Sequence, residues 1–248
     1  MAEQDEHQDY PDADAAVVQG GEAPSARTPL SVERVVTAAV EFIDEQGLAG
    51  LTMRRLGETL GVEAMSLYRY VAGREKLLDA VVESITAQLD DDPEVLQEPR
   101  DGWQDFLVRL AHGVRRVALS HPKVFPLVAS RPLEAPWLRP PLRSLTWVEL
   151  FLDALRAEGF DDDSAVGAYR AFTSFLLGHL LLEVSTHGAD VGPLDVLEED
   201  EEPGGLAAYP TVARLRSALS EDHSALEFED ALDQLVDRVA QMASPKVP

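Results

Sequence analysis

Apolar residues recur every three or four positions over most of the chain, which is the period of an amphipathic α-helix. In the N-terminal third this pattern predicts four helices separated by residues that cap or end helices. The first runs from Ser31, a natural N-cap, to Gly47, where the chain can turn in a left-handed conformation. The second starts at Thr52, the third at Glu63, and the fourth follows Gly73.

The remainder of the chain continues the helical period. One stripe starts at Trp103 and stops at His121-Pro122, because proline cannot continue a helix. Alternating β patterns are absent, and a chain without asparagine has no Asn-Gly hairpin turns. The predicted fold class is therefore all-α. Further helices are predicted near 122–129, 141–158, 164–187, 207–219 and 225–242.

Two stretches lack a helical period and are strongly acidic. Residues 1–27 contain seven acids and one base, and residues 188–205 contain seven acids and no base. Segments of low hydrophobicity and high net charge do not bury enough apolar surface to fold. We expect a disordered acidic tail at 1–27 and a mobile acidic loop at 188–205.

The charge of the whole chain argues against an extended nucleic-acid-binding surface. The 45 acidic and 21 basic residues give a formal net charge of −24 and a pI near 4.4. Such a surface repels phosphate and anionic lipid. A nucleic-acid role therefore requires a local exception to the acidic charge.

Several classes of site find no support in the residues present. The absence of cysteine excludes disulfides, thiolate chemistry and cysteine-based zinc sites. His179 and Glu183, four residues apart, are weak indicators of a metal, so no metal or cofactor is expected. Residues 1–21 show no secretory signal, and the most apolar stretch, Ala171–Val184, is too short to span a bilayer. We expect a soluble cytoplasmic protein.

The stretch Leu51–Tyr70, LTMRRLGETLGVEAMSLYRY, has the pattern of a helix-turn-helix. Gly57 lies on the first helix where a side chain would meet the second, and Gly61 can adopt the left-handed turn conformation. A helix that starts at Thr52 offers free N–H groups to a phosphate. The second helix of such a motif enters the major groove of DNA. The small shared core is assigned to Leu56, Leu60, Val62 and Leu67.

The helix-turn-helix stretch is also the local exception in charge. Residues 52–76 carry five bases and three acids, a balance of +2 within a chain of −24. Because phosphate contacts supply most of the affinity for DNA, bases around the turn favour binding. The alternative is an ordinary helical hairpin whose bases are solvated. The five bases are Arg54, Arg55, Arg69, Arg74 and Lys76.

The order and spacing of residues over 28–88 resemble the DNA-binding head of the TetR family of repressors. The resemblance implies a three-helix helix-turn-helix domain at 28–88, followed at 95–243 by a larger helical domain for effector binding and dimerisation. One departure is Tyr70-Val71, where many members have a His-Phe or similar pair. The matching residues are Gln46-Gly47, Leu51-Thr52, Arg54, Leu56, Leu60-Gly61-Val62, Leu67-Tyr68-Arg69-Tyr70-Val71 and Arg74-Glu75-Lys76-Leu77-Leu78.

The resemblance also implies roles for the residues around the turn. Those at the start of the second helix face base edges, and those near its end and at the start of the next helix meet the DNA backbone. For Met65, contact with a base or its methyl group and simple exposure on the helix surface are both open. The implied DNA-binding set is Thr52, Arg54, Arg55, Ala64, Met65, Ser66, Tyr68, Arg69, Tyr70, Arg74 and Lys76.

Two helices of the larger domain carry patterns that predict a dimer interface. The helix from Ser164 becomes apolar nearly all round, which predicts burial on both sides. The last helix repeats a single apolar stripe, and its Phe228–Asp233 resembles the closing helix of tetracycline-repressor-type C-terminal domains. TetR-like repressors typically dimerise through a four-helix interface of this kind. The alternative is burial of the last helix within one chain.

Aromatic residues of the larger domain are candidates for an effector pocket. Together with two histidines they suit a small, mostly apolar effector. The alternative for each of them is ordinary burial in the core. The candidates are Trp103, Phe106, His112, Trp147, Phe151, Tyr169, Phe172 and His179.

These features together predict a transcriptional regulator. We expect a homodimeric repressor that binds a palindromic operator in double-stranded DNA and is released by a small-molecule effector. An enzyme is not expected, because no nucleophile–base pair, phosphate loop or metal signature is present. An acidic protein-binding module would leave the spacing of residues 51–76 unexplained.

Overall fold

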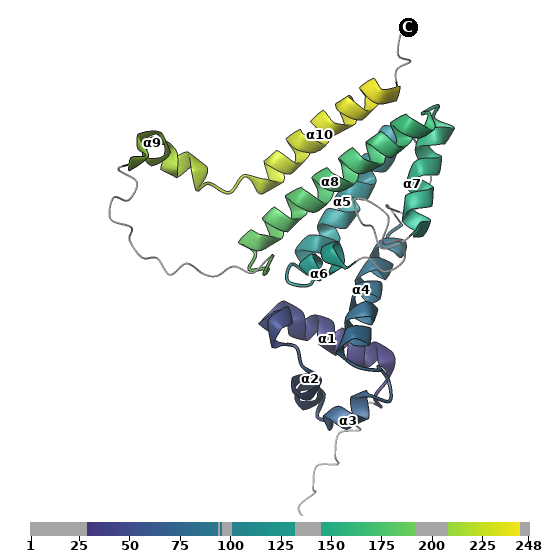
Figure 1. Cartoon of the computed structure of the whole chain (residues 1–248), viewed down its shortest axis with the longest axis vertical. Helices are drawn as coiled ribbons and strands as arrows, with labels where there is room; N and C mark the ends of the chain where they lie inside the picture. Colours follow the sequence, from purple (N-terminus) through teal and green to yellow (C-terminus); the bar gives the residue numbers. More distant parts are fainter. Residues whose placement is uncertain (1–28, 94, 96–100, 132–144, 192–207, 244–248) are drawn as a thin grey trace, which may run out of the picture. The chain divides into compact units, whose positions relative to one another are not determined.

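The computed structural model describes residues 29–93, 95, 101–131, 145–191 and 208–243. Within these ranges the regular secondary structure is entirely helical, which confirms the all-α class (Figure 1). The predicted tail at 1–27 and residues 192–205 of the predicted loop lie outside the described residues. The helices are α1 Val32–Gln46, the short 3-10 helix η1 Leu48–Gly50, α2 Met53–Leu60, α3 Ala64–Leu67, α4 Arg74–Asp90, α5 Trp103–Ser120, α6 Phe125–Ser130, α7 Leu145–Ala157, α8 Asp162–Thr186, α9 Pro210–Leu219 and α10 Ser224–Ala243.

Capping side chains and glycines set the ends of the N-terminal helices. The Ser31 hydroxyl accepts a hydrogen bond from the Arg34 amide at 3.1 Å, and Gly47 follows α1 with a φ of +80°. Thr52 and Gly73 are the N-caps of α2 and α4. These boundaries confirm the prediction from the sequence.

The head, which we define as α1 to α3 with the start of α4, has a small apolar core. Helix α4 packs against α1 and also against α5 and α6, so it belongs to both the head and the rest of the chain, the body (Figure 1). Leu60 and Val62, predicted as core residues, are only half-buried because they lie at the edge of the turn. The head core includes Val35, Ala39, Ile43, Leu51, Leu56, Leu67, Leu77 and Val81.

Helix α8 is the central helix of the body and packs against α5, α6, α7 and α10 (Figure 1). It begins earlier than the predicted Ser164, because the Asp161 carboxylate accepts a hydrogen bond from the Ser164 amide at 2.7 Å and caps the helix. Its 25 residues extend well beyond Ala171–Val184, and by length and composition alone it could cross a membrane. Core helices of soluble proteins pass the same test, and α8 has that place in the body.

One side of α8 faces outward in the single chain. Leu182 is 71% exposed, and Val166, Arg170, Ser174 and Gly178 are exposed as well. Each of these positions is four residues from the next, so they form a continuous stripe that winds gradually around the helix. Burial of α8 on both sides therefore requires a second chain over this stripe and stays a prediction.

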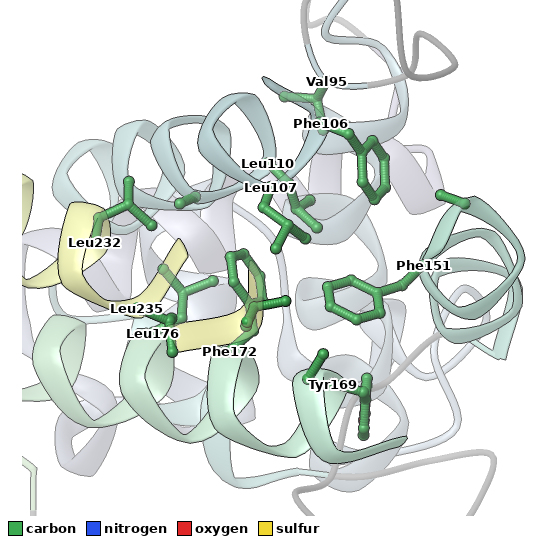
Figure 2. Close-up of a cluster of buried hydrophobic side chains, with 14 of the residues drawn as sticks. Val95, Phe106, Leu107, Leu110, Phe151, Tyr169, Phe172, Leu176, Leu232 and Leu235 are labelled. Carbon is green, nitrogen blue, oxygen red and sulfur yellow. The ribbon is translucent and has the colours of Figure 1, made fainter. Parts of the chain in front are cut away.

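Helix α10 directs its apolar stripe into the body, where it packs along α8 and α5. Figure 2 shows its Leu232 and Leu235 in the same buried cluster as Phe172 and Leu176 of α8. Of the two interpretations of this stripe, burial within one chain is therefore the one that the structure supports. The buried residues of α10 are Phe228, Leu232, Leu235 and Val239.

A buried ion pair joins α5 to α8. The Arg115 guanidinium donates through Nε to Glu183 Oε2 at 3.0 Å and through Nη2 to the other carboxylate oxygen. Glu183 is 3% exposed, and Cζ of Arg115 lies 5.0 Å from the centre of the Phe228 ring. The hydrogen bond with Glu183 raises the pKa of Arg115. Because the pair is largely removed from water, each charge depends on the other for compensation.

Candidate nucleic-acid interface and effector cavity

The turn between α2 and α3 is built on two glycines. Gly61 has φ +68° and ψ 32°, a left-handed conformation that glycine adopts at little cost. A Cβ on Gly57 would lie 2.8 Å from the Val62 carbonyl oxygen, so the close approach of the helices requires glycine there. The Thr52 hydroxyl caps α2 by accepting a hydrogen bond from the Arg55 amide at 3.2 Å. These contacts fix the orientation of α3 on α2.

Helix α3 has one buried and one exposed side. Leu67 is fully buried in the head, whereas Met65 is 73% exposed. Ala64 and Ser66 are half-buried. Exposed side chains continue past the end of the helix, so the side of residues 64–70 opposite Leu67 faces solvent. The exposed residues after α3 are Tyr68, Arg69 and Tyr70.

Three of the five cations around the turn extend from the surface of the head. Arg54 forms an exposed ion pair with Glu58 at 3.8 Å, and Lys76 pairs with Asp79 at 3.3 Å. Arg69 is exposed and forms no ion pair with any residue that the structure describes. Exposed ion pairs contribute little to stability, so all three cations can reorient toward a phosphate.

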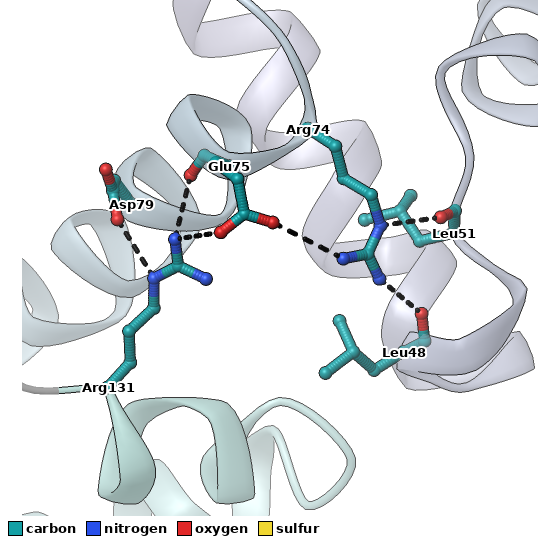
Figure 3. Close-up of polar contacts among 6 residues, drawn as sticks. All are labelled: Leu48, Leu51, Arg74, Glu75, Asp79 and Arg131. Carbon is teal, nitrogen blue, oxygen red and sulfur yellow. Dashed lines mark hydrogen bonds and ion pairs between the residues drawn. The ribbon is translucent and has the colours of Figure 1, made fainter.

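The other two cations, Arg55 and Arg74, turn into the head. The Arg74 guanidinium donates to the Leu51 carbonyl at 3.1 Å and to the Leu48 carbonyl at 3.3 Å (Figure 3). The Arg55 guanidinium donates to the Gly50 carbonyl at 2.9 Å. Both arginines therefore bind the loop between α1 and α2. These hydrogen bonds already occupy two side chains that were predicted to contact DNA.

Arg131, at the end of α6, connects the body to α4 (Figure 3). Its Nε donates to Asp79 Oδ1 at 2.9 Å, and its Nη2 donates to Glu75 Oε2 at 2.8 Å. Burial raises the pKa of Asp79, but hydrogen bonds from Lys76 and Arg131 outweigh burial and bring this pKa below its ordinary value. The carboxylate is thus ionised at neutral pH and available to both cations.

A cavity of about 100 Å³ lies among residues of α4, α5, α6, α7 and α8. Three of the eight predicted effector residues, Trp147, Phe151 and Phe172, line it. Thr86 and Thr173 add hydroxyl groups to a lining that is otherwise apolar or aromatic. The remaining lining residues are Leu89, Leu110, Val114, Phe125, Val128, Ala129, Leu176 and Leu177.

The other five predicted effector residues do not line this cavity. His112 and His179 lie against Phe228 of α10, with ring centroids 5.7 Å and 5.2 Å from its own. His112 also lies 3.4 Å from a carboxylate oxygen of Glu229. The remaining three, two of which are labelled in Figure 2, are buried core residues: Trp103, Phe106 and Tyr169.

The contributions of α4 and α6 to the cavity were missed from the sequence. Thr86 and Leu89 come from α4, and Val128 and Ala129 come from α6. The available signal was the length of α4, whose helical pattern continues to Asp90, beyond what a small head requires. Aromatic content alone pointed instead to side chains that fill the core.

Two family models match the chain. Residues 35–81 match bacterial regulatory proteins of the tetR family, and residues 96–243 match the tetracyclin repressor-like C-terminal domain. The second match alone spans more than half of the chain.

Individual proteins of this kind match over most of their length. Tetracycline repressor protein class A from transposon 1721 of Escherichia coli is 28% identical over 217 residues, which are 86% of this chain and 92% of that protein. A possible TetR family transcriptional regulator from Streptomyces coelicolor A3(2) has a crystal structure with a TM-score of 0.67 and 29% identity, covering 85% of this chain and 99% of that one. A TetR variant from Acinetobacter baumannii AYE, crystallised in complex with minocycline, has a TM-score of 0.61 and 25% identity over 87% of this chain and 99% of that one. The chain therefore belongs to the TetR family of bacterial regulatory proteins and is a DNA-binding transcriptional regulator.

Proposed function

We propose that the chain is a cytoplasmic repressor that binds a palindromic operator through its head and leaves the operator when a small apolar effector enters the body. The observation that carries the proposal is the exposure of Met65, Tyr68, Arg69 and Tyr70 on a helix-turn-helix whose opposite side is buried in the head core. The DNA-binding domain is residues 28–88, and the effector-binding and dimerisation domain is residues 95–243. Helix α4 connects the two.

The side chains of the head divide into three groups by the contacts that they are free to make. Residues at the start of α3 approach the edges of the DNA bases. The exposed basic side chains, hydroxyl groups and phenol groups around them bind phosphates. Arg55 and Arg74 support the surface from behind through the carbonyls that they bind. Base contacts are assigned to Ala64, Met65 and Ser66, and backbone contacts to Thr52, Arg54, Tyr68, Arg69, Tyr70 and Lys76.

A palindromic operator requires two heads, and the body offers a surface for a second copy. Leu182 and Val166 on the outward side of α8 are exposed, and so is Leu226 in the first turn of α10. A homodimer that covers these side chains removes apolar surface from water. Two heads in a symmetric dimer would read half-sites about 34 Å apart, one turn of the double helix.

The cavity accounts for release from the operator. At about 100 Å³ it is smaller than the roughly 300 Å³ or more of a pocket for a drug-sized ligand, so such an effector must displace the surrounding helices. Thr86 and Leu89 lie on α4, the helix that starts next to the DNA-binding surface. Arg131 also binds α4 directly. An effector that binds a displaced arrangement better than the original one therefore changes the placement of the head.

The DNA-binding part of the proposal is tested with the purified full-length protein and duplexes from its own upstream DNA. Fluorescence anisotropy across a salt series should show a palindromic fragment bound more tightly than random duplex. Arg69→Ala and Tyr70→Ala should weaken that binding, whereas Arg216→Ala, an exposed arginine of α9, should leave it unchanged. Equal affinity for palindromic and random duplexes would contradict the proposal.

The effector part is tested by thermal-shift screening with small apolar compounds. A ligand at 100 times its Kd stabilises the folded state by about 2.7 kcal/mol. The same ligand should lower operator affinity. Ala129→Leu adds volume to the cavity lining and should remove the thermal shift while operator binding persists. A ligand that stabilises this variant as much as the original protein binds elsewhere.

A further inference from the structure

Met65 is the most exposed large apolar side chain in the part of the chain that the structure describes. Leu67, two residues on, is fully buried and fixes the rotation of α3, so Met65 cannot turn into the core. Tyr68 follows Met65 by three residues and is 48% exposed, which places the two on the same side of the helical turn. We call this pair the apolar ridge. Exposed apolar surface with a polar and basic rim is typical of an interaction site.

The chemistry of the major groove restricts what an apolar ridge can recognise. Thymine alone among the four bases offers an apolar group there, its C5-methyl group. Guanine, adenine and cytosine present donors and acceptors, which a methionine side chain pairs with poorly. Residues 64–66 otherwise provide an alanine methyl group and a half-buried serine hydroxyl, and no bidentate side chain for a purine. The sequence preference of α3 must therefore come largely from apolar contact.

We infer that Met65 is a specificity-determining residue that packs against the C5-methyl group of a thymine in each operator half-site. This inference rests on the proposed function, because it names the base that the α3 surface reads. The same chemistry extends to 5-methylcytosine, whose methyl group occupies the corresponding position in the groove. Unmodified cytosine lacks that group.

The experiment uses the full-length protein and synthetic duplexes of its preferred operator, selected from a random library. Each thymine of one half-site is replaced in turn by deoxyuridine, which removes the methyl group and keeps the hydrogen-bonding pattern. At one position the affinity should fall ~4-fold, as expected for the loss of one apolar carbon group from a contact. Two further duplexes carry cytosine or 5-methylcytosine in place of that thymine. The protein should bind the 5-methylcytosine duplex more tightly than the cytosine duplex by a similar factor.

Variants at position 65 assign the effect to this side chain. Met65→Ala should bind the thymine and deoxyuridine duplexes with equal affinity, because the contact is already lost. Met65→Leu keeps an apolar side chain and should keep the discrimination. Val32→Ala, which removes an exposed apolar side chain from another helix of the head, should discriminate like the original protein. Both positions are exposed, so unfolding measurements should show intact folding for all three variants.

The outcomes separate this inference from the proposed function. Specific operator binding with no thymine sensitive to deoxyuridine overturns the inference and leaves the repressor proposal standing. Discrimination that persists in Met65→Ala assigns the methyl contact to another residue and also overturns it. If no duplex is preferred over random sequence, both the proposed function and the inference fail.

Discussion

The head and the body use their charged side chains in opposite ways. In the head, arginines that point inward bind backbone carbonyls, and three cations remain exposed around α3. In the body, the Arg115–Glu183 pair is largely buried among apolar side chains. We therefore expect function in the head to depend on exposed groups whose removal leaves the fold intact, whereas the charged pair of the body is needed for the fold itself. Substitutions should separate these two kinds of dependence.

The largest expected effect on stability is in the body. Glu183→Ala leaves the Arg115 guanidinium without its partner in a site largely removed from water, and the free energy of unfolding should fall by about 3–5 kcal/mol. Urea unfolding followed by circular dichroism measures this change. Asp233→Ala, an exposed acid on α10, should stay within about 0.5 kcal/mol of the original protein. Similar values for both variants would show that the buried pair is not structural.

The next effect concerns the turn in the head. In Gly57→Ala the new Cβ meets the Val62 carbonyl oxygen, so the turn must shift, and stability should fall by about 1–3 kcal/mol. Operator affinity should fall with it, because α3 is displaced. Gly167→Ala in α8 is the matched control, since its nearest neighbour would be the Met242 sulfur at an ordinary 3.8 Å. This control should be neutral or slightly stabilising, as alanine is in helices.

A smaller effect is expected where the body meets α4. Arg131→Ala removes the hydrogen bonds to Asp79 and Glu75, and the unfolding free energy should fall by about 1 kcal/mol at pH 7. Because the pKa of Asp79 is lowered in the folded state, the contribution of its carboxylate is present above the unfolded pKa of about 4 and is lost as the pH falls through the folded value. The difference between the two proteins should therefore shrink below about pH 4. A difference that grows with acidity would contradict this assignment.

The parts of the molecule that the sequence predicts well are those set by local interactions. The head helices begin and end at caps and glycines whose preferences act within a few residues, such as Ser31 and Gly61. The direction of Arg55 and Arg74 depends on carbonyls in a 3-10 turn that the periodicity does not reveal. For this reason the sequence alone does not distinguish these two arginines from Arg69.

The cavity of the body depends on contacts between helices that are distant in the sequence, and its lining was predicted less completely. Trp147, Phe151 and Phe172 line the cavity. Phe106 and Trp103 are also aromatic residues of the same domain, but they lie in the core. An aromatic residue on an amphipathic helix fits either place. Only the packing of five helices decides between them.

We propose that the exposed surface around α3, and not the head as a whole, binds the operator. The most direct test is the dependence of operator affinity on salt for Arg69→Ala and Arg55→Ala, measured side by side. We predict that Arg69→Ala reduces the magnitude of the negative slope of log K against log salt by about 1 for each bound head. The same substitution should change the free energy of unfolding by less than about 0.5 kcal/mol. Arg55→Ala should keep the original slope and lose about 1 kcal/mol of stability instead. An unchanged slope for Arg69→Ala together with a reduced slope for Arg55→Ala would contradict the account.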